Sequence, residues 1–334
     1  MHRGISYYDS RFADHAFADI DRIKEAGCTY VVHTFSEQDM MFNKENVADI
    51  IAYTKEKGME AHVDPWGVAG IFGGETFSYF VTRNHHCLQV KSDGSKAQLA
   101  CINHPDLVNF MYRWIDEATG IGADIIFWDE PHFYLPGWFN VKEPMDVWGC
   151  RCDICQDLYR KMFDEPMPQK ETDEVQKFKL HSLIEFLRKM FFYSARKGLK
   201  NTTCMLPFEL MRDSGSWEKV ASLPDLYGFG TDPYWTSVKK LRVKFDLDEY
   251  MRPFCKEVKR LADIYNLRSH IWIQNFSIPQ GEEDIITQAI DIALSEGIED
   301  ICAWTYFGAK GMASLRSDRP QVVWDTLRKS YLKR

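Results

Sequence analysis

Short apolar runs with strand character alternate along the chain with longer amphipathic stretches of helical length. Apolar runs of about four to eight residues bounded by polar turns are typical of buried strands, whereas longer stretches with a period of about 3.6 residues predict helices. Eight runs of the first kind lie at 4–9, 29–35, 60–66, 124–129, 202–207, 226–232, 270–275 and 300–305. The helical patterns between them include 16–26, 46–57, 105–119, 173–197, 247–266 and 282–296.

Strands that alternate with helices predict a parallel sheet whose neighbouring strands are joined by crossover helices. Eight such units favour a closed (β/α)8 barrel, a TIM barrel, over an open sheet. The chain carries no Gly-x-Gly-x-x-Gly motif or phosphate-binding loop that would indicate a nucleotide-binding fold. We therefore predict an α/β protein in which residues 1–334 form a single TIM-barrel domain.

Two of the predicted units contain long insertions. Residues 67–104 separate the third strand from its helix, and residues 132–170 follow the fourth strand. Loops of this length are usually functional. Both insertions follow the carboxyl end of a strand, which is the catalytic face of a TIM barrel, so we expect them to surround the active site.

Polar residues that end the apolar strands are expected to point into the mouth of the barrel. Carboxylates dominate this set, and converging carboxylates from several strands are typical of acid/base chemistry. Amides, histidines and aromatic side chains complete it. The strand-end residues are Asp9, His33, Asp64, Trp66, Asp129, Glu130, His132, Glu209, Asp232, Tyr234, Gln274, Asn275 and Trp304.

The sequence Asp129-Glu130-Pro131 offers the best candidate for a catalytic acid. It follows the strongly apolar run 125–128, and desolvation in such surroundings raises the pKa of a carboxyl group toward the working pH. Glycoside hydrolysis needs two carboxyl groups that flank the bond to be cleaved. The aromatic share of 14% also suits a site that stacks on sugar faces. We expect substrate contacts from Asp64, Trp66, His132, Tyr234, Gln274, Asn275 and Trp304.

Three of the nine cysteines stand together as Cys150-Arg-Cys152-Asp-Ile-Cys155. This spacing gathers three thiolates within one turn, as tetrahedral zinc requires. In a chain of this length, clustered cysteines are better explained by a metal than by a disulfide framework. Cys87 and the pair His85-His86 are weaker ligand candidates in the preceding loop.

Two motifs resemble those of known glycoside hydrolases. Asp129-Glu130-Pro131 resembles the Asn-Glu-Pro signature of clan A enzymes, with Asp in place of Asn, which implies that Glu130 is the acid/base residue. Trp304 ends the last strand as the clan A subsite tryptophan does. Cys101-Ile-Asn-His-Pro105, followed by the cysteine triplet, resembles the zinc cluster of family 42 β-galactosidases. That resemblance implies a structural Zn²⁺ held by Cys101, Cys150, Cys152 and Cys155, with His104 as an alternative to Cys101.

The chain departs from the clan A pattern at the seventh strand. Clan A enzymes carry their nucleophilic Glu there, whereas this sequence has Gln274 and Asn275. A second pairing, Asp129 with Asp232, resembles the carboxylates of α-galactosidase-like and α-glucosidase-like barrels. A third possibility is an inverting mechanism, in which Glu130 is the acid and Asp64 or Asp232 is the base. The carboxyl separation distinguishes these mechanisms.

The charge distribution narrows the class of partners. The net charge of −8 is spread along the chain, and there is no block of Lys and Arg, so nucleic acid is disfavoured as a partner. The N-terminus has no apolar signal region, and no window approaches the about 20 apolar residues of a membrane span. We expect a cytoplasmic protein that binds a small saccharide or glycoside; the sequence predicts no oligomeric state.

Three functions remain open from the sequence. The first is a glycoside hydrolase with a structural zinc that uses Glu130, Asp129 and Asp232 as catalytic residues. The second is a carbohydrate-binding barrel without catalytic activity, because the seventh-strand Glu is missing. The third is a metal-dependent hydrolase that uses His33, His62, Asp64 and His132.

Overall fold

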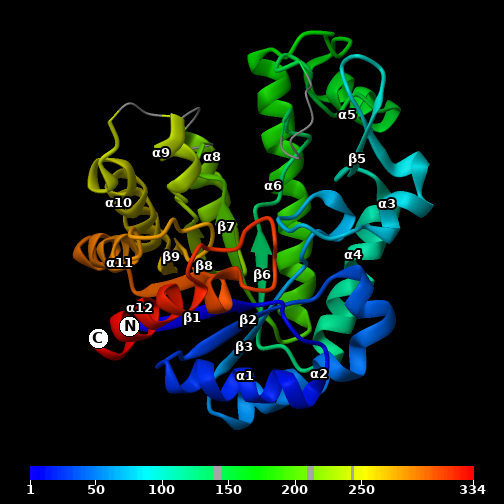
Figure 1. The fold of residues 1–334 in the computed structure, drawn as a ribbon. Helices are drawn as coiled ribbons and strands as arrows, with labels where there is room; N and C mark the ends of the chain where they lie inside the picture. The colour runs from blue at the N-terminus through cyan, green and yellow to red at the C-terminus, as the bar shows by residue number, and fades with distance from the viewer. Residues whose placement is uncertain (138–143, 209–213, 242–243) are drawn as a thin grey trace.

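The computed structural model describes residues 1–137, 144–208, 214–241 and 244–334, and its closed barrel confirms the predicted TIM-barrel fold (Figure 1). All neighbouring strands of the barrel pair in parallel, in the order β1-β10-β9-β8-β7-β6-β3-β2. The barrel strands are β1 (His2–Tyr7), β2 (Tyr30–Thr34), β3 (Glu60–Asp64), β6 (Ile125–Asp129), β7 (Lys200–Met205), β8 (Leu226–Thr231), β9 (Arg268–Gln274) and β10 (Asp300–Trp304).

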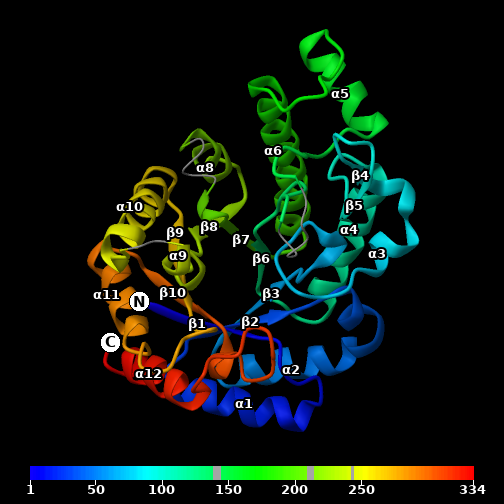
Figure 2. The same cartoon turned by 45° about the horizontal axis from the view of Figure 1, so that its top comes forward.

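Helices surround the barrel on its outside, and the N- and C-termini lie near each other on one flank (Figure 2). The two C-terminal helices, α11 and α12, close the ring between α10 and α1. The helices are α1 (Ala13–Glu25), α2 (Lys44–Glu56), α3 (Tyr79–Arg83), α4 (Pro105–Gly120), α5 (Asp153–Phe163), α6 (Asp173–Arg196), α8 (Ser214–Ala221), α9 (Thr236–Leu241), α10 (Leu247–Tyr265), α11 (Ile285–Ser295) and α12 (Pro320–Leu332).

Alternation along β6 explains how one strand serves both the core and the site. Trp128 is fully buried on the outer side, where it packs against Trp114 of α4 and Phe191 of α6. Its neighbours Phe127 and Asp129 point to the barrel interior, because successive side chains of a strand point to opposite faces. Phe127 packs there against Trp272, with ring centroids 4.6 Å apart. Apolar side chains therefore pack inside the barrel, and polar residues lie at the carboxyl ends of the strands.

The N-terminal end of the barrel is closed by buried charges. Arg268 forms an ion pair with Asp300 at 2.9 Å, and the Tyr30 hydroxyl donates a hydrogen bond to the same carboxylate at 2.6 Å. Arg268 also pairs with Glu60 at 3.1 Å. These ion pairs offset the cost of burying the Arg268 charge alone, so this end has a structural role.

The insertion after β3 forms secondary structure of its own. It contains the short 3-10 helices η2 (Val68–Gly70) and η3 (His85–Cys87), the helix α3, and an antiparallel hairpin of β4 (Leu88–Val90) and β5 (Lys96–Ala100). The insertion after β6 leads into α5, which stands with the upper part of α6 above the barrel beside that hairpin (Figure 1). The sequence pattern did not predict the hairpin, α3 or α5. No helix in the described part of the chain is long and apolar enough to span a membrane.

Candidate active site and cysteine cluster

A pocket of about 460 Å³ opens at the carboxyl ends of the barrel strands. It brings together most of the residues that the sequence predicted at strand ends. Five carboxylates line it, four at the ends of three strands and Glu75 in a loop, together with aromatic rings and a glycine-rich segment. The lining residues are Asp64, Trp66, Gly73, Gly74, Glu75, Phe127, Asp129, Glu130, Asp232, Tyr234, Trp272, Phe276, Trp304, Ser314 and Leu315.

The carboxylates converge because each stands at the same end of a parallel strand. Asp64 and Asp129 are the last residues of β3 and β6, and Asp232 follows β8 directly. Glu130 has a positive φ of 43°. Its amide donates a hydrogen bond to the Cys204 carbonyl at 3.1 Å. A positive φ is costly for a residue with a side chain, and such residues cluster at functional sites.

Burial and mutual repulsion favour the protonated forms of the carboxyl groups in the pocket. The pKa of Asp64 and that of Asp129 are both raised well above the usual range, first by burial and then by the neighbouring carboxylates. Burial raises the pKa of Asp232 to about 7. The site therefore holds both protonated and ionised carboxyl groups near neutral pH, as general acid catalysis with a second carboxylate requires.

Glu130 lies beside Asp232. A side-chain interaction with Glu130 lowers the pKa of Asp232 and acts against the larger effect of burial. Asp232 Oδ1 and Asp64 Oδ1 are buried and have no hydrogen-bond partner among the described residues. Both oxygens are available to a ligand in the pocket.

A wall of stacked rings borders the carboxylates. Tyr8 stacks on Trp66 and on Trp304, with ring centroids 5.6 Å apart in each case. Trp66 and Trp304 themselves lie 6.2 Å apart. Tyr234 contacts Phe276 edge to face at 5.0 Å. Flat apolar rings beside polar groups suit the alternating faces of a sugar.

The residues Gly73 to Glu75 of this pocket were missed from the sequence, as were Phe127, Trp272, Phe276, Ser314 and Leu315. Gly73 lies so close to Asp129 that a Cβ atom there would be 2.3 Å from Asp129 Oδ2. At Gly74 it would be 1.9 Å from Trp66 Cδ1. The signal that pointed here was the Gly-Gly pair inside a long loop, since glycine is needed where a backbone approaches a site closely.

Three predicted substrate contacts do not line the pocket. Gln274 Oε1 accepts hydrogen bonds from the amides of Trp235 at 2.8 Å and Thr236 at 3.0 Å. Asn275 Nδ2 donates to the Thr305 carbonyl at 2.8 Å, and His132 Nδ1 lies 2.6 Å from the Glu130 carbonyl oxygen. All three side chains contact main-chain groups instead. Glu209, also a predicted strand-end residue, lies outside the described residues.

The ligand set of the metal-dependent hydrolase hypothesis is not brought together. His33 Nε2 lies 3.0 Å from Thr54 Oγ1 on α2, and His62 stacks on Tyr30 in the lower barrel. Neither histidine lines the pocket. In the described part of the chain, neither of the two groups of side chains suited to hold a metal ion includes Asp64 or His132.

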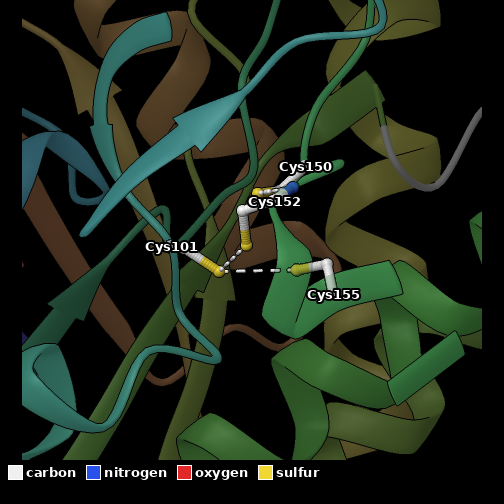
Figure 3. A group of neighbouring side chains, drawn as sticks. All are labelled: Cys101, Cys150, Cys152 and Cys155. Carbon is white, nitrogen blue, oxygen red and sulfur yellow. Dashed lines mark hydrogen bonds between the residues drawn. The ribbon is translucent and has the colours of Figure 1, made fainter. Parts of the chain in front are cut away.

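The four cysteines predicted as zinc ligands do come together (Figure 3). Cys101 follows β5, Cys150 and Cys152 precede α5, and Cys155 lies in its first turn. The Cys101 sulfur is 3.4 Å from that of Cys155 and 3.6 Å from that of Cys152. Zn–S bonds of about 2.3 Å in a tetrahedron place the sulfur atoms roughly 3.8 Å apart, so this donor set fits zinc. The alternative ligand His104 is not in this group.

Comparison with known proteins adds support for the fold. No protein-family model matches the chain, and no curated protein sequence does either. Among solved structures, the chain is similar to the PgaB (BpsB) glycoside hydrolase domain from Bordetella bronchiseptica, with a TM-score of 0.63, 8% identity, and coverage of 98% of this chain and 99% of that one. The chain is also similar to a GH5_18 structure from Streptomyces cattleya in complex with GlcNAc, with a TM-score of 0.58, 12% identity, and coverage of 100% of this chain and 81% of that one.

An enzyme that is not a glycoside hydrolase also has a fold similar to that of this chain. The D-allulose 3-epimerase from Methylomonas sp. in complex with D-allulose matches with a TM-score of 0.54 and 10% identity, over 100% of this chain and 95% of that one. At these identities the likeness establishes the TIM-barrel fold alone, because this fold hosts many reactions. The chemistry has to be argued from the pocket.

Proposed function

We propose that the protein is a glycoside hydrolase that cleaves a glycosidic bond by carboxylate acid/base catalysis. The observation that carries this proposal is the convergence of Asp64, Asp129, Glu130 and Asp232 in a pocket walled by aromatic rings. Because the pKa values of Asp64, Asp129 and Asp232 are raised, protonated and ionised carboxyl groups coexist there near neutral pH, and the reaction needs both states. Glycoside hydrolases among the structures of similar fold support the same chemistry.

In the proposed mechanism, Glu130 protonates the oxygen of the leaving group. Asp232 attacks the anomeric carbon from the opposite face and forms a glycosyl ester. Glu130, now ionised, removes a proton from the water that hydrolyses this ester, and both residues return to their starting states. The interaction between Glu130 and Asp232 favours this retaining route, because it places the pair nearer to the carboxyl separation of about 5–5.5 Å in retaining enzymes than to the about 6.5–9.5 Å in inverting ones.

The remaining pocket residues would bind the sugar. Asp64 and Asp129 are placed to accept hydrogen bonds from hydroxyl groups, while Trp66, Tyr234 and Trp304 offer flat faces. No Lys, Arg or His is among the described residues that line the pocket. A pocket of this charge favours neutral or cationic sugars over uronates, sulfated sugars or sugar phosphates.

We also propose a structural role for Zn²⁺ bound by Cys101, Cys150, Cys152 and Cys155. Four thiolates leave no open coordination position, so the ion would support the fold rather than the reaction. It would link the hairpin of the 67–104 insertion to the start of α5. In this arrangement residues 1–334 act as one domain, and the insertions 67–104 and 132–170 shape the face that carries the pocket.

The test is hydrolysis of a panel of α- and β-linked aryl glycosides and small oligosaccharides, with the product anomer followed by NMR. Glu130→Gln and Asp232→Asn should each lower kcat by at least about 100-fold, as loss of general acid catalysis or of the nucleophile does. Glu282→Gln is the matched control, because Glu282 pairs with Lys239 outside the pocket. Full activity of both pocket variants would refute the proposal.

A second candidate is a carbohydrate-binding barrel that has no catalytic activity. The amides Gln274 and Asn275, in place of a seventh-strand carboxylate, favour it. Calorimetry would then detect saccharide binding to the wild type, with no turnover over days of incubation. Any hydrolysis that depends on Glu130 excludes this alternative.

A further inference from the structure

A second group of metal-binding side chains lies at the base of the β4–β5 hairpin. It consists of His86, Cys87, His104 and Asp106, whose ligand atoms all lie within 4.8 Å of one another. None of the four belongs to the cysteine cluster, and none lines the carboxylate pocket. This group therefore needs an explanation that is independent of the proposed hydrolase activity.

The distances among these atoms resemble the edges of a coordination tetrahedron. The Cys87 sulfur lies 3.4 Å from His104 Nδ1, and the same nitrogen lies 3.9 Å from Asp106 Oδ2. His86 Nε2 lies 2.8 Å from that carboxylate oxygen. Bonds of about 2.0–2.3 Å from zinc to N, O and S place tetrahedral ligand atoms roughly 3.2–3.8 Å apart. All four ligand atoms lie within 4.8 Å of one another, which is close to that geometry.

The backbone holds the four ligands in register. His86 and Cys87 directly precede β4, whereas His104 and Asp106 follow β5 and begin α4. The amide of Cys101 donates to the Cys87 carbonyl at 2.7 Å, and the amide of His104 donates to the Cys101 carbonyl at 2.9 Å. The two ends of the hairpin thus each contribute two ligands, and main-chain hydrogen bonds join those ends without a metal.

We propose that His86, Cys87, His104 and Asp106 bind a second zinc ion. One thiolate, two imidazole nitrogens and one carboxylate oxygen form a four-ligand set that suits zinc, while the thiolate and imidazoles disfavour Mg²⁺ and Ca²⁺. The ion takes the place of the His86–Asp106 hydrogen bond and of the bond that the Asp106 amide donates to His104 Nδ1. It joins the base of the hairpin to the start of α4.

Exposure distinguishes the two sites. The side chains of His86 and Asp106 are 60% and 53% exposed, whereas Cys101, Cys150 and Cys155 are buried. An ion at the second site is open to water and to chelators on one side. It should exchange readily, and a chelator should remove it before the ion at the cysteine cluster.

The experiment measures zinc per chain by mass spectrometry of the native protein and by elemental analysis, after incubation with excess ZnCl₂ and desalting. Wild type should carry two ions per chain. His86→Ala and Asp106→Asn should each reduce the number to one, and Cys101→Ser should remove the other ion. His15→Ala is the matched control, because His15 is also exposed and lies on α1, away from the hairpin.

Titration of Co²⁺ gives a second readout. The absorption from thiolate-to-cobalt charge transfer should appear in two steps, and Cys87→Ser should abolish the step that belongs to the site with one thiolate. The affinity of the second step should fall at least tenfold in His86→Ala. One ion per chain in wild type, or two ions unchanged in His86→Ala, Asp106→Asn and Cys87→Ser alike, would overturn the proposal. Circular dichroism checks that the variants at the exposed residues His86 and Asp106 remain folded.

Discussion

The amide of Gly73 donates a hydrogen bond to the main-chain carbonyl of Asp129 at 3.0 Å, and a Cβ atom at position 73 would lie 2.3 Å from the carboxylate of the same residue. The beginning of the 67–104 insertion is thus in direct contact with Asp129 at the end of β6. Catalytic geometry of the kind proposed here depends on such support, because shifts of about 1 Å lower rates severely.

Gly73→Ala should lower kcat/KM strongly and leave the fold intact. The added methyl group meets the side-chain oxygen of Asp129, so the carboxylate or the loop must move. We expect a loss of at least about tenfold in kcat/KM, since misplacement by about 1 Å is enough for larger losses. Gly120→Ala is the control, because nothing lies within 4 Å of a Cβ at that position near the end of α4. Equal kinetics in both variants would contradict the argument.

The Glu37 side chain forms hydrogen bonds with three groups of the 67–104 insertion. Its buried carboxylate accepts hydrogen bonds from the Ala69 amide at 2.8 Å, the Ser78 hydroxyl at 2.7 Å and the Phe80 amide at 2.6 Å. Glu37→Gln replaces one acceptor oxygen by an NH₂ group, which leaves buried donors facing a donor. We expect a loss of about 1–3 kcal/mol in the free energy of unfolding.

Chemical denaturation of Glu37→Gln, beside the exposed control Glu45→Gln, measures that loss. If Glu37 positions the loop, the variant should also raise KM or lower kcat at temperatures where it remains folded. A variant that is less stable but kinetically normal would show that Glu37 supports the fold only.

Loss of the proposed zinc ion from the cysteine cluster should destabilise the insertions more than the barrel. Cys101→Ser takes one thiolate from the donor set, and a strong chelator takes the ion itself, so both should expose the hairpin and α5 to proteolysis. Cys28→Ala is the control, since Cys28 is also buried but lies outside both ligand groups. Limited proteolysis with mass mapping provides the measurement. Cleavage patterns identical to wild type in Cys101→Ser would argue against a metal there.

The sequence located the barrel strands well because each is a short apolar run, and the structure moves their ends by only a few residues. Strand ends also predicted the convergence of Asp64, Asp129, Glu130 and Asp232, since parallel strands bring their carboxyl ends to one face. The Cys150 to Cys155 spacing is a local signal, so the cysteine cluster was predictable too.

Features that depend on tertiary contacts were not predictable in this way. The approach of Gly73 to Asp129 and the bonds that Glu37 makes to Ala69, Ser78 and Phe80 join segments far apart in the sequence, and no periodicity records them. His86 and Cys87 looked like spare ligands until the register of the hairpin placed them beside His104 and Asp106. Gln274 and Asn275 end a strand as substrate contacts would, yet their side chains bind main-chain groups of adjacent loops.

Trp304→Ala should weaken substrate binding more than it slows the reaction. Trp304 stacks on Tyr8 and borders the carboxylates, so its loss removes a flat face for the sugar and loosens the neighbouring ring. We expect KM to rise by roughly tenfold, which corresponds to about 1.4 kcal/mol. Phe12→Ala, at an exposed ring outside the pocket, is the control. Steady-state kinetics on the best substrate of the panel separates the two parameters.

Asp232→Asn should stabilise the protein while it abolishes activity. Burial raises the pKa of Asp232 in the folded protein from 3.8 to about 7. Between these values the folded state holds a proton that the unfolded chain has released, so stability falls as the pH rises from about 4 to about 7. Above that range the folded protein carries the full cost of a buried carboxylate, and the neutral amide of Asn removes this cost.

The gain in stability should therefore depend on pH. The difference in Tm between Asp232→Asn and wild type should be largest at pH 8, by about 2–4 °C or more, and smallest near pH 4. Thermal unfolding at several pH values measures it, with Glu282→Gln as the control that should show no such trend. A difference that is constant with pH would mean that Asp232 is not the titrating group. A loss of stability at pH 8 would mean that contacts in the folded protein stabilise ionised Asp232 by more than burial costs, and it would contradict a raised pKa for this group.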